Sequence, residues 1–448
     1  MKKNRLSVTE KIGYGLGDFG SNIVFQTILI LLPAFYTDVF GLAPVAMGTM
    51  FLVVRLLDTV TDPLMGMIAD NTHTRWGQFR PYLLWFAMPF GIVFVLTYTT
   101  PEFSESGKLL YAYATYSALM LLYTVVNIPY CALGGALTPD SKERVSANSY
   151  RFFLATFAGV LITYFGPDLI ASFGNGDEKA GYPWAMGVFS ILAVAAFLGC
   201  FALTRERVHQ ASSAKSSFKL DLLTLFQNDQ WLLVAVMFLI LLVPIVLRGG
   251  SAIYYIKWFA ERPDLVAAFL TAGTVSQMIG ATFASPISRI TGNRVAYILV
   301  QIAIVLGSVG LYFAPSHNLI IVFSLFIWIN FFVQMGAPLL FSMAADTVDY
   351  GELRTGRRVT GLAFSGALFA LKLGVALGGW LIGFILAWYG YDGKADNQSP
   401  EAIQGLVLSM TLFPAIGHAL LIPFAALYKL DHQKCLRIRT ELDQRKSN

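Results

Sequence analysis

Long apolar stretches recur along the whole chain and are separated by short polar segments. About 20 mostly apolar residues cross the hydrocarbon layer of a bilayer as one helix, so each stretch of that length predicts a membrane-spanning helix. The pattern therefore predicts an all-α membrane protein. We expect its twelve spanning helices at residues 11–40, 44–69, 81–99, 109–132, 147–172, 183–204, 229–258, 264–287, 295–314, 318–346, 360–390 and 403–428.

The composition supports this prediction. Of the 448 residues, 56% are hydrophobic and 13% are charged, whereas about a quarter of the residues in a soluble domain are charged. Lys2, Lys3 and Arg5 precede the first predicted span, and no small-residue cleavage site follows it, so we expect that span to remain in the mature protein. The three cysteines form no pattern typical of a disulfide framework or a metal site, and we expect no cofactor.

The formal charge of +5 is distributed in a way that indicates topology rather than nucleic-acid binding. With the N-terminus inside, 23 of the 32 Lys and Arg residues fall in cytoplasmic segments and 5 on the opposite side. Positive charge concentrates in the cytoplasmic segments of membrane proteins, so we expect both termini in the cytoplasm. The expected macromolecular surroundings are a lipid bilayer and no nucleic acid.

A polar segment between the sixth and seventh spans divides the chain into two predicted halves. We expect an N-terminal six-helix half at 1–204, a cytoplasmic linker at 205–228, a C-terminal six-helix half at 229–428 and a cytoplasmic tail at 429–448. Two parallel six-helix halves with a substrate site near the bilayer midplane are typical of a carrier that works by alternating access.

One glycine pattern in the first span imitates a nucleotide-binding motif. Gly15-Leu-Gly17-Asp-Phe-Gly20 matches the dinucleotide fingerprint, but that motif requires a preceding strand in a βαβ unit. We expect these glycines to allow close helix packing instead, as Gly374 and Gly378 would in the eleventh span.

Two carboxylates lie in the second predicted span, where a charge costs roughly 2.5 to 3.5 kcal/mol. Asp58 and Asp62 are four residues apart and so share one face of the helix, with Arg55 one turn earlier. Two carboxylates on one face repel each other unless a cation or a proton lies between them. The pattern favours a coupling-ion site with Thr61 as a further ligand; the alternative is that both aspartates only pair with Arg55 and Arg151.

Further polar side chains lie in the first and fourth predicted spans, at depths where a lipid-facing residue is normally apolar. Asp18 and Asn22 are in the first span, and Tyr123 and Asn127 are in the fourth. Such groups typically face a wet cavity, so we expect them to contact substrate. Asn127 has an equally good alternative role, a hydrogen bond that joins two helices.

Basic residues in three other spans complete the candidate substrate-binding groups: Arg151, Arg248 and Lys372. Together with Arg55 they give four positive charges in the spans against three carboxylates, a balance that favours an anionic substrate such as a sugar acid. Tyr123 and Trp380 are our candidates for stacking on a sugar ring, because most other aromatic residues of a membrane protein serve packing or the interface.

Two cytoplasmic segments combine acidic and basic residues. We interpret them as a latch, or cytoplasmic gate, that holds the halves together when the carrier opens outward; the alternative is a solvated topogenic loop. Several ion pairs at a closing seam can shift a two-state equilibrium even though each is individually weak. The predicted gate residues are Asp70, Arg75, Arg80, Asp349 and Arg354.

These motifs together resemble the glycoside–pentoside–hexuronide:cation symporter family of the major facilitator superfamily, which includes the melibiose permeases. The match covers nearly the whole chain. The motifs that it rests on are Tyr14-Gly-Leu-Gly17, Phe35-Tyr-Thr-Asp38, Arg55-Leu-Leu-Asp58, Asp62-Pro63-Leu-Met-Gly66, Arg75-Trp-Gly77, Arg80-Pro81, Asn127-Ile-Pro129, Arg151-Phe-Phe153, Asp346-Thr-Val-Asp349-Tyr-Gly351 and Lys372-Leu-Gly374.

The resemblance implies the major facilitator fold and cation-coupled sugar uptake across a bacterial inner membrane. It implies that Asp58 and Asp62 bind the coupling ion, either H⁺ or, as a metal, Na⁺. It adds Thr61 and Thr124 as oxygen donors. It also places the sugar between the first, fourth, fifth, tenth and eleventh helices.

Two departures from the melibiose-type pattern bear on the substrate. Where those members have a Lys-Asp pair in the first helix, this chain has Ser21 and Asn22; where they have an aspartate and a tryptophan in the fourth, it has Asn127 and Cys131. Arg248 is an addition. The pattern is closer to the pentoside and hexuronide branches, and an amide can still bind hydroxyls as donor and acceptor.

We therefore predict a secondary active transporter, a multi-pass monomer that moves a small glycoside or sugar acid together with Na⁺ or H⁺. The alternative on the same fold is an exporter or exchanger of a small anionic sugar derivative. A membrane enzyme is disfavoured because no motif places a nucleophile beside a base, and a channel because it would need no paired acids at the midplane.

Overall fold

The computed structural model describes residues 5–138, 141–207, 223–357 and 359–447. Regular structure in these ranges is helical apart from one isolated bridge between Thr74 and Gly77. The helices are α1 (Val8–Ile30), α2 (Leu32–Ala34), η2 (Phe35–Val39), α3 (Pro44–Asp70), α4 (Arg80–Thr97), α5 (Glu105–Ala136), α6 (Ser141–Gly174), α7 (Glu178–Leu203), α9 (Asp229–Tyr254), η3 (Tyr255–Phe259), η4 (Pro263–Leu265), α10 (Val266–Thr291), α11 (Asn293–Tyr312), α12 (Leu319–Thr355), α13 (Thr360–Trp388), α14 (Pro400–Met410), α15 (Leu412–Leu427) and α16 (His432–Ser447).

Eleven helical segments of the described chain are long and apolar enough to cross a membrane, and the bent pair formed by α1 and Leu32–Val39 makes a twelfth. The predicted all-α class with twelve spans is confirmed. The first span, predicted at 11–40, bends by 49° near Leu31. Pro33 lacks the backbone N–H that would continue the helical hydrogen bonds there.

Contacts divide the chain into two compact units. Unit 1 comprises residues 1–213, 264–271 and 391–398, and unit 2 comprises residues 214–263, 272–390 and 399–448. The predicted six-helix halves stay a prediction, and most of the predicted linker, 205–228, lies outside the described residues.

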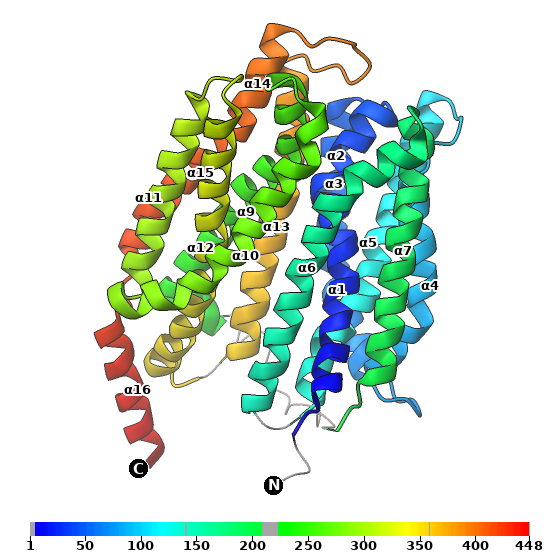
Figure 1. Ribbon diagram of the computed structural model, residues 1–448. Coiled ribbons are helices and arrows are strands. Elements are labelled where there is room, and N and C mark those ends of the chain that lie inside the picture. The colour runs from blue at the N-terminus through cyan, green and yellow to red at the C-terminus, as the bar shows by residue number, and fades with distance from the viewer. Residues whose placement is uncertain (1–4, 139–140, 208–222, 358, 448) are drawn as a thin grey trace. The chain divides into compact units, whose positions relative to one another are not determined.

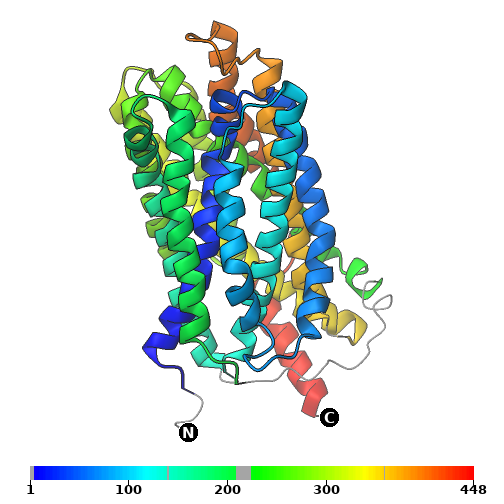
Figure 2. The same cartoon turned by 90° about the vertical axis from the view of Figure 1, so that its right-hand side faces the viewer.

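Unit 1 is organised around α1, which packs against α6 and α7. Figure 1 shows α1 running alongside α6, and Figure 2 shows the same unit after a quarter turn. A Cβ atom at Gly15 would lie 3.0 Å from the carbonyl oxygen of Tyr150, and one at Gly20 would lie 3.0 Å from that of Ala193. These glycines therefore allow close helix packing, as the sequence predicts.

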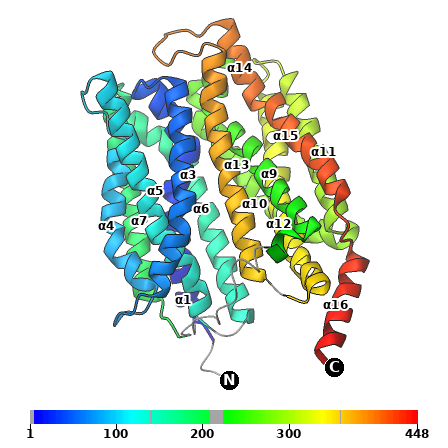
Figure 3. The ribbon, with the colours of Figure 1, turned by 180° about the vertical axis from the view of Figure 1, so that it is seen from behind.

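Unit 2 is organised around α9, which packs against α13 and α15, while α11 packs against α12 and α15. Figure 3 shows α9 and α13 side by side. A Cβ atom at Gly378 would lie 2.8 Å from the Cβ atom of Val246, and one at Gly374 would collide with the carbonyl oxygen of Leu239. Small residues again set the distance between two helices.

A carboxylate fixes the loop between α3 and α4. Glu206 accepts hydrogen bonds from the backbone N–H groups of Gln78, Phe79 and Arg80, at 2.7, 2.8 and 2.9 Å. These groups begin α4, where backbone donors lack partners within the helix and favour a negative charge. Gly77 has φ +113°, and a Cβ atom there would lie 2.5 Å from Glu206 Oε1.

We expect Gly77→Ala to destabilise the protein by about 1–3 kcal/mol, because alanine is strained at this backbone conformation and displaces the Glu206 carboxylate. The matched control is Gly187→Ala in α7, where a Cβ atom would meet nothing within 4 Å. Thermal unfolding of the purified protein in detergent measures the difference. Equal midpoints for the two variants would contradict the proposed tight fit at Gly77.

Candidate cation and substrate sites

Helices α3 and α5 bring two carboxylates to one hydroxyl group. Asp58 and Asp62 lie one turn apart on α3, and Asp58 is only 3% exposed. The hydroxyl oxygen of Thr124 on α5 lies 2.5 Å from Asp58 Oδ1 and 2.9 Å from Asp62 Oδ1. The structure thus brings together three of the four residues predicted to bind the coupling ion.

The hydroxyl of Thr124 has one proton, so it can donate to only one of these two carboxylates at a time. A proton on the carboxyl group, or a cation bound to both oxygens, can satisfy the other oxygen–oxygen contact. Arg55 Nη1 lies 4.0 Å from the second oxygen of Asp58, and the Arg55 guanidinium also lies over the ring of Phe25.

Thr61, the fourth predicted ligand, turns its hydroxyl proton toward its own helix. It donates a 3.0 Å hydrogen bond to the backbone oxygen of Asp58 and keeps its lone pairs available. The ligand set is made of oxygen atoms, as hard cations prefer. No group of three or more His, Cys, Asp or Glu side chains in the described part of the chain could hold a metal.

An ion pair crosses from α1 to α6. Arg151 Nε lies 2.9 Å from Asp18 Oδ2, and Arg151 Nη2 lies 3.5 Å from Oδ1. The guanidinium also lies over the ring of Tyr130, whose hydroxyl donates to the backbone oxygen of Tyr14. The side chain of Asn22 donates to the backbone oxygen of Asp18, one turn earlier. Sequence reasoning selected Asp18 and Arg151 separately and missed that they pair.

The other candidates of unit 1 lie along α5. Tyr123 contacts the rings of Phe25 and Phe90 at 6.0 and 6.4 Å between centroids. Asn127 is one turn further along and half-buried. Cys131 is one more turn along, with its sulfur 3.8 Å from Arg151 Nη2. The face of α5 that presents Tyr123 therefore leads to the Asp18–Arg151 pair.

Arg248 of unit 2 is 4% exposed, and its side chain bonds to the end of α14, where the helix is interrupted before α15. It donates from Nε to the backbone oxygen of Met410 and from Nη2 to the hydroxyl of Ser308, at 3.2 and 2.7 Å. Met410 ends α14, and the residue four positions later is Pro414, which has no N–H to donate. Arg248 therefore replaces a missing backbone donor.

The remaining substrate-binding candidates of unit 2 lie on α13. Lys372 and Trp380 are both half-buried. The ring of Trp380 stacks on Phe384 with 5.3 Å between centroids. Phe384 therefore covers one face of the indole. Contact between Trp380 and a sugar ring stays a prediction.

The predicted gate residues of unit 1 have local partners. The guanidinium of Arg75 lies 4.3 Å from the ring centroid of Trp76. Arg80 donates to the backbone oxygens of Trp76 and Phe201. The side chain of Asp70 lies outside the described part of the structure.

In unit 2, Arg354 Nη1 lies 2.7 Å from Asp229 Oδ1, at the start of α9. Tyr350 also donates to this carboxylate. Asp349 is half-buried on the same helix as Arg354. Sequence reasoning did not find Asp229, because nothing in its local sequence marks it as a partner.

Comparison with known proteins identifies the group of proteins to which the chain is similar. The family described as MFS/sugar transport protein matches residues 13–432. The inner membrane symporter YicJ of Escherichia coli (strain K12) is 42% identical, over 94% of this chain and 91% of its own. The putative glycoside/cation symporter YagG of the same organism is 41% identical, over 98% of this chain and 95% of its own.

A solved structure shares the fold. The crystal structure of a D-xylose-proton symporter superimposes with a TM-score of 0.67 at 13% identity, and the match covers 95% of this chain and 97% of the other. An identity this low shows the fold alone. The prediction of a membrane transporter rather than an enzyme is confirmed by the family and by the relatives. This chain belongs to the MFS/sugar transport family, among the glycoside–pentoside–hexuronide:cation symporters that its motifs resemble.

Proposed function

We propose that this protein transports a glycoside or a sugar acid together with Na⁺ or H⁺ by alternating access. Asp58, Asp62 and Thr124 bind the coupling ion. The observation that supports this role is the pair of carboxylates sharing one hydroxyl proton, at 2.5 and 2.9 Å. The glycoside class is supported by the name of the relative YagG, a putative glycoside/cation symporter.

The substrate contacts Asp18 and Arg151 in this proposal. Their ion pair presents an acceptor and a donor side by side, and both can bind sugar hydroxyl groups. Asn22 and Tyr123 belong to the same site, because Asn22 bonds to Asp18 and the face of α5 bearing Tyr123 leads to Arg151. The proposed transporter is a monomer with both termini in the cytoplasm, an orientation that the distribution of basic residues supports.

Uptake into proteoliposomes tests the proposal. A β-xyloside, a β-glucuronide and a galactoside are offered under a Na⁺ gradient and, separately, under a H⁺ gradient. We expect accumulation of a pentoside or glucuronide above its external concentration under one gradient and none without it. Flux that ignores both gradients would favour an exchanger, and efflux driven by the gradient would favour an exporter.

Removing one carboxylate charge separates coupling from substrate binding. We expect Asp58→Asn to abolish uphill accumulation and to retain substrate exchange, because the neutral amide cannot share the coupling ion with Asp62. Accumulation and counterflow are measured on the same proteoliposomes. Full accumulation by this variant would show that Asp58 does not bind the coupling ion.

The Thr124 hydroxyl gives a second prediction. We expect Thr124→Val to raise the coupling-ion concentration required for half-maximal uptake by about tenfold, because it removes a hydrogen bond to a charged group. Thr124→Ser keeps the hydroxyl and should stay near the original value. Thr115→Val is the matched control, since Thr115 lies on the same helix and its hydroxyl donates to the backbone oxygens of Tyr111 and Ala112. The idea fails if the valine and serine variants at 124 behave alike.

A further inference from the structure

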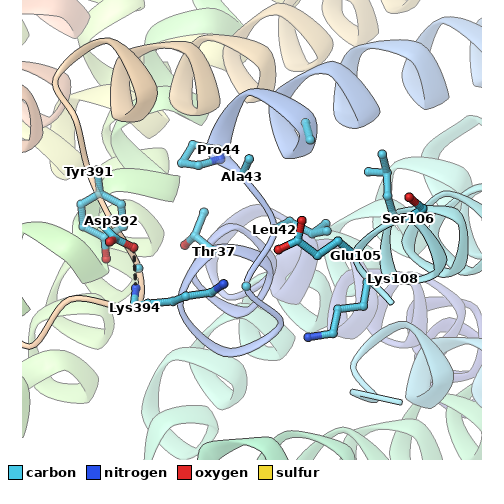
Figure 4. Close-up of a pocket in the computed structure, with 14 residues that line it drawn as sticks. Thr37, Leu42, Ala43, Pro44, Glu105, Ser106, Lys108, Tyr391, Asp392 and Lys394 are labelled. Carbon is cyan, nitrogen blue, oxygen red and sulfur yellow. Dashed lines mark hydrogen bonds between the residues drawn. The ribbon is translucent and has the colours of Figure 1, made fainter. Parts of the chain in front are cut away.

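A pocket lies in unit 1, and neither the carboxylate pair nor the Asp18–Arg151 ion pair is among the residues that line it. Its volume is about 540 Å³, within the range of small-molecule sites. Three segments form it: the end of the first span with the start of α3, the start of α5, and residues 391–394 (Figure 4). All of its lining residues belong to unit 1.

One wall of the pocket is a loop, residues 391–398, which we call the strap. The hydroxyl of Tyr391 donates a 2.8 Å hydrogen bond to Asp38 Oδ1, and the hydroxyl of Thr37 donates to the same oxygen at 2.7 Å. Gly393 packs so closely that a Cβ atom there would collide with the carbonyl oxygen of Thr37. The strap is therefore held on the end of the first span by specific contacts.

The strap also has its own internal hydrogen bonds. Asp392 Oδ1 accepts from the backbone N–H of Lys394 at 2.9 Å, and the side chain of Gln398 both donates to and accepts from the backbone of Asp392. The stem of Lys394 crosses Gly41, where a Cβ atom would lie 3.2 Å from Lys394 Cε. Gly41 thus leaves the space that directs the Lys394 ammonium into the pocket.

Two ammonium groups face this pocket and make no ion pair in the structure as described: those of Lys108 and Lys394. Figure 4 shows both directed toward the cavity, with the carboxylate of Glu105 beside them. The carboxylate of Asp392 is already bonded within the strap.

Helices α3 and α5 both begin at the pocket, and helix N-termini favour negative charge. The formal charges of the lining balance, because the two ammoniums face the carboxylates of Glu105 and Asp392, and the two helix ends add partial positive charge. The Asp392 carboxylate already accepts a hydrogen bond within the strap, so the ammoniums and the helix ends are the groups available to an anionic ligand.

We propose that this pocket binds a sugar that has a carboxylate. The carboxylate of the ligand lies between Lys108 and Lys394. The hydroxyl groups of the ligand form hydrogen bonds with the carboxylate of Glu105 and the hydroxyl of Ser106. This inference rests on the proposed function, because it takes the ligand to be the acidic form of the transported sugar.

Thiol labelling of purified full-length protein tests the site without requiring transport. Ser106→Cys is introduced after the three native cysteines are replaced by serine, and its reaction rate with a thiol reagent is followed in neutral-lipid nanodiscs. Methyl β-glucuronide and methyl β-xyloside are compared at equal ionic strength, because they differ by the carboxylate alone. We expect the glucuronide to slow labelling several-fold and the xyloside to leave it unchanged.

Charge variants make the test specific. We expect Lys108→Gln and Lys394→Gln each to weaken protection by the glucuronide about threefold to fivefold. Glu105→Gln should strengthen it, because it removes the nearest negative charge. Lys179→Gln is the matched control, an exposed lysine that does not line the pocket.

A further variant tests the contact between the strap and the first span. Tyr391→Phe removes the hydrogen bond to Asp38 and should speed labelling of the cysteine at 106 when no ligand is present. Equal protection by glucuronide and xyloside would overturn the proposal, as would equal effects of the Lys108 and Lys179 variants. If transport fails while the glucuronide still protects the cysteine, the proposed function is wrong and the proposed binding at the pocket is kept. If transport occurs and the glucuronide gives no specific protection, only the proposed binding at the pocket is wrong.

Discussion

The structure depends on one constraint: a charge within the bilayer is stable only beside a partner. Asp18 and Arg151 meet this requirement through an ion pair between α1 and α6. Arg248 meets it differently, through the neutral oxygens of Met410 and Ser308. An unpaired charge would cost several kcal/mol at such depths, so these contacts also fix how α1 meets α6 and how α9 meets α11 and α14.

The carboxylate pair on α3 satisfies the same constraint in another way. Thr124 lies against both Asp58 and Asp62 and has one proton to offer. The net charge of this site therefore changes when a proton or a cation binds to it. In the proposed function this site binds the coupling ion, whereas the Asp18–Arg151 pair is already neutral as a unit. The two arrangements lie in one unit and are the proposed sites of the coupling ion and of the substrate.

The sequence predicts the part of this picture that depends on local spacing. The apolar stretches predict the spans, and the four-residue spacing of Asp58 and Asp62 places them on one helix face. Local spacing does not predict contacts between segments that are far apart in the sequence. Asp18 and Arg151 are 133 residues apart, and the Glu206 contacts with the start of α4 join positions 126 to 128 residues apart. Such pairings depend on helix rotation and packing, for which a local pattern holds no information. A proline alone does not predict the bend near Leu31, because Pro63, Pro89 and Pro129 lie inside continuous helices.

The break between α14 and α15 has a consequence for reading variation at position 248. Arg248 supplies to the oxygen of Met410 the hydrogen bond that Pro414 cannot supply. A side chain on α9 thereby supplies a hydrogen bond that the main chain normally supplies within a helix. The residues at 248 and 414 therefore depend on each other structurally. Arg248 thus compensates for the proline at 414. In relatives, a change at either position is best interpreted together with the other, before it is assigned to a difference in what the protein transports.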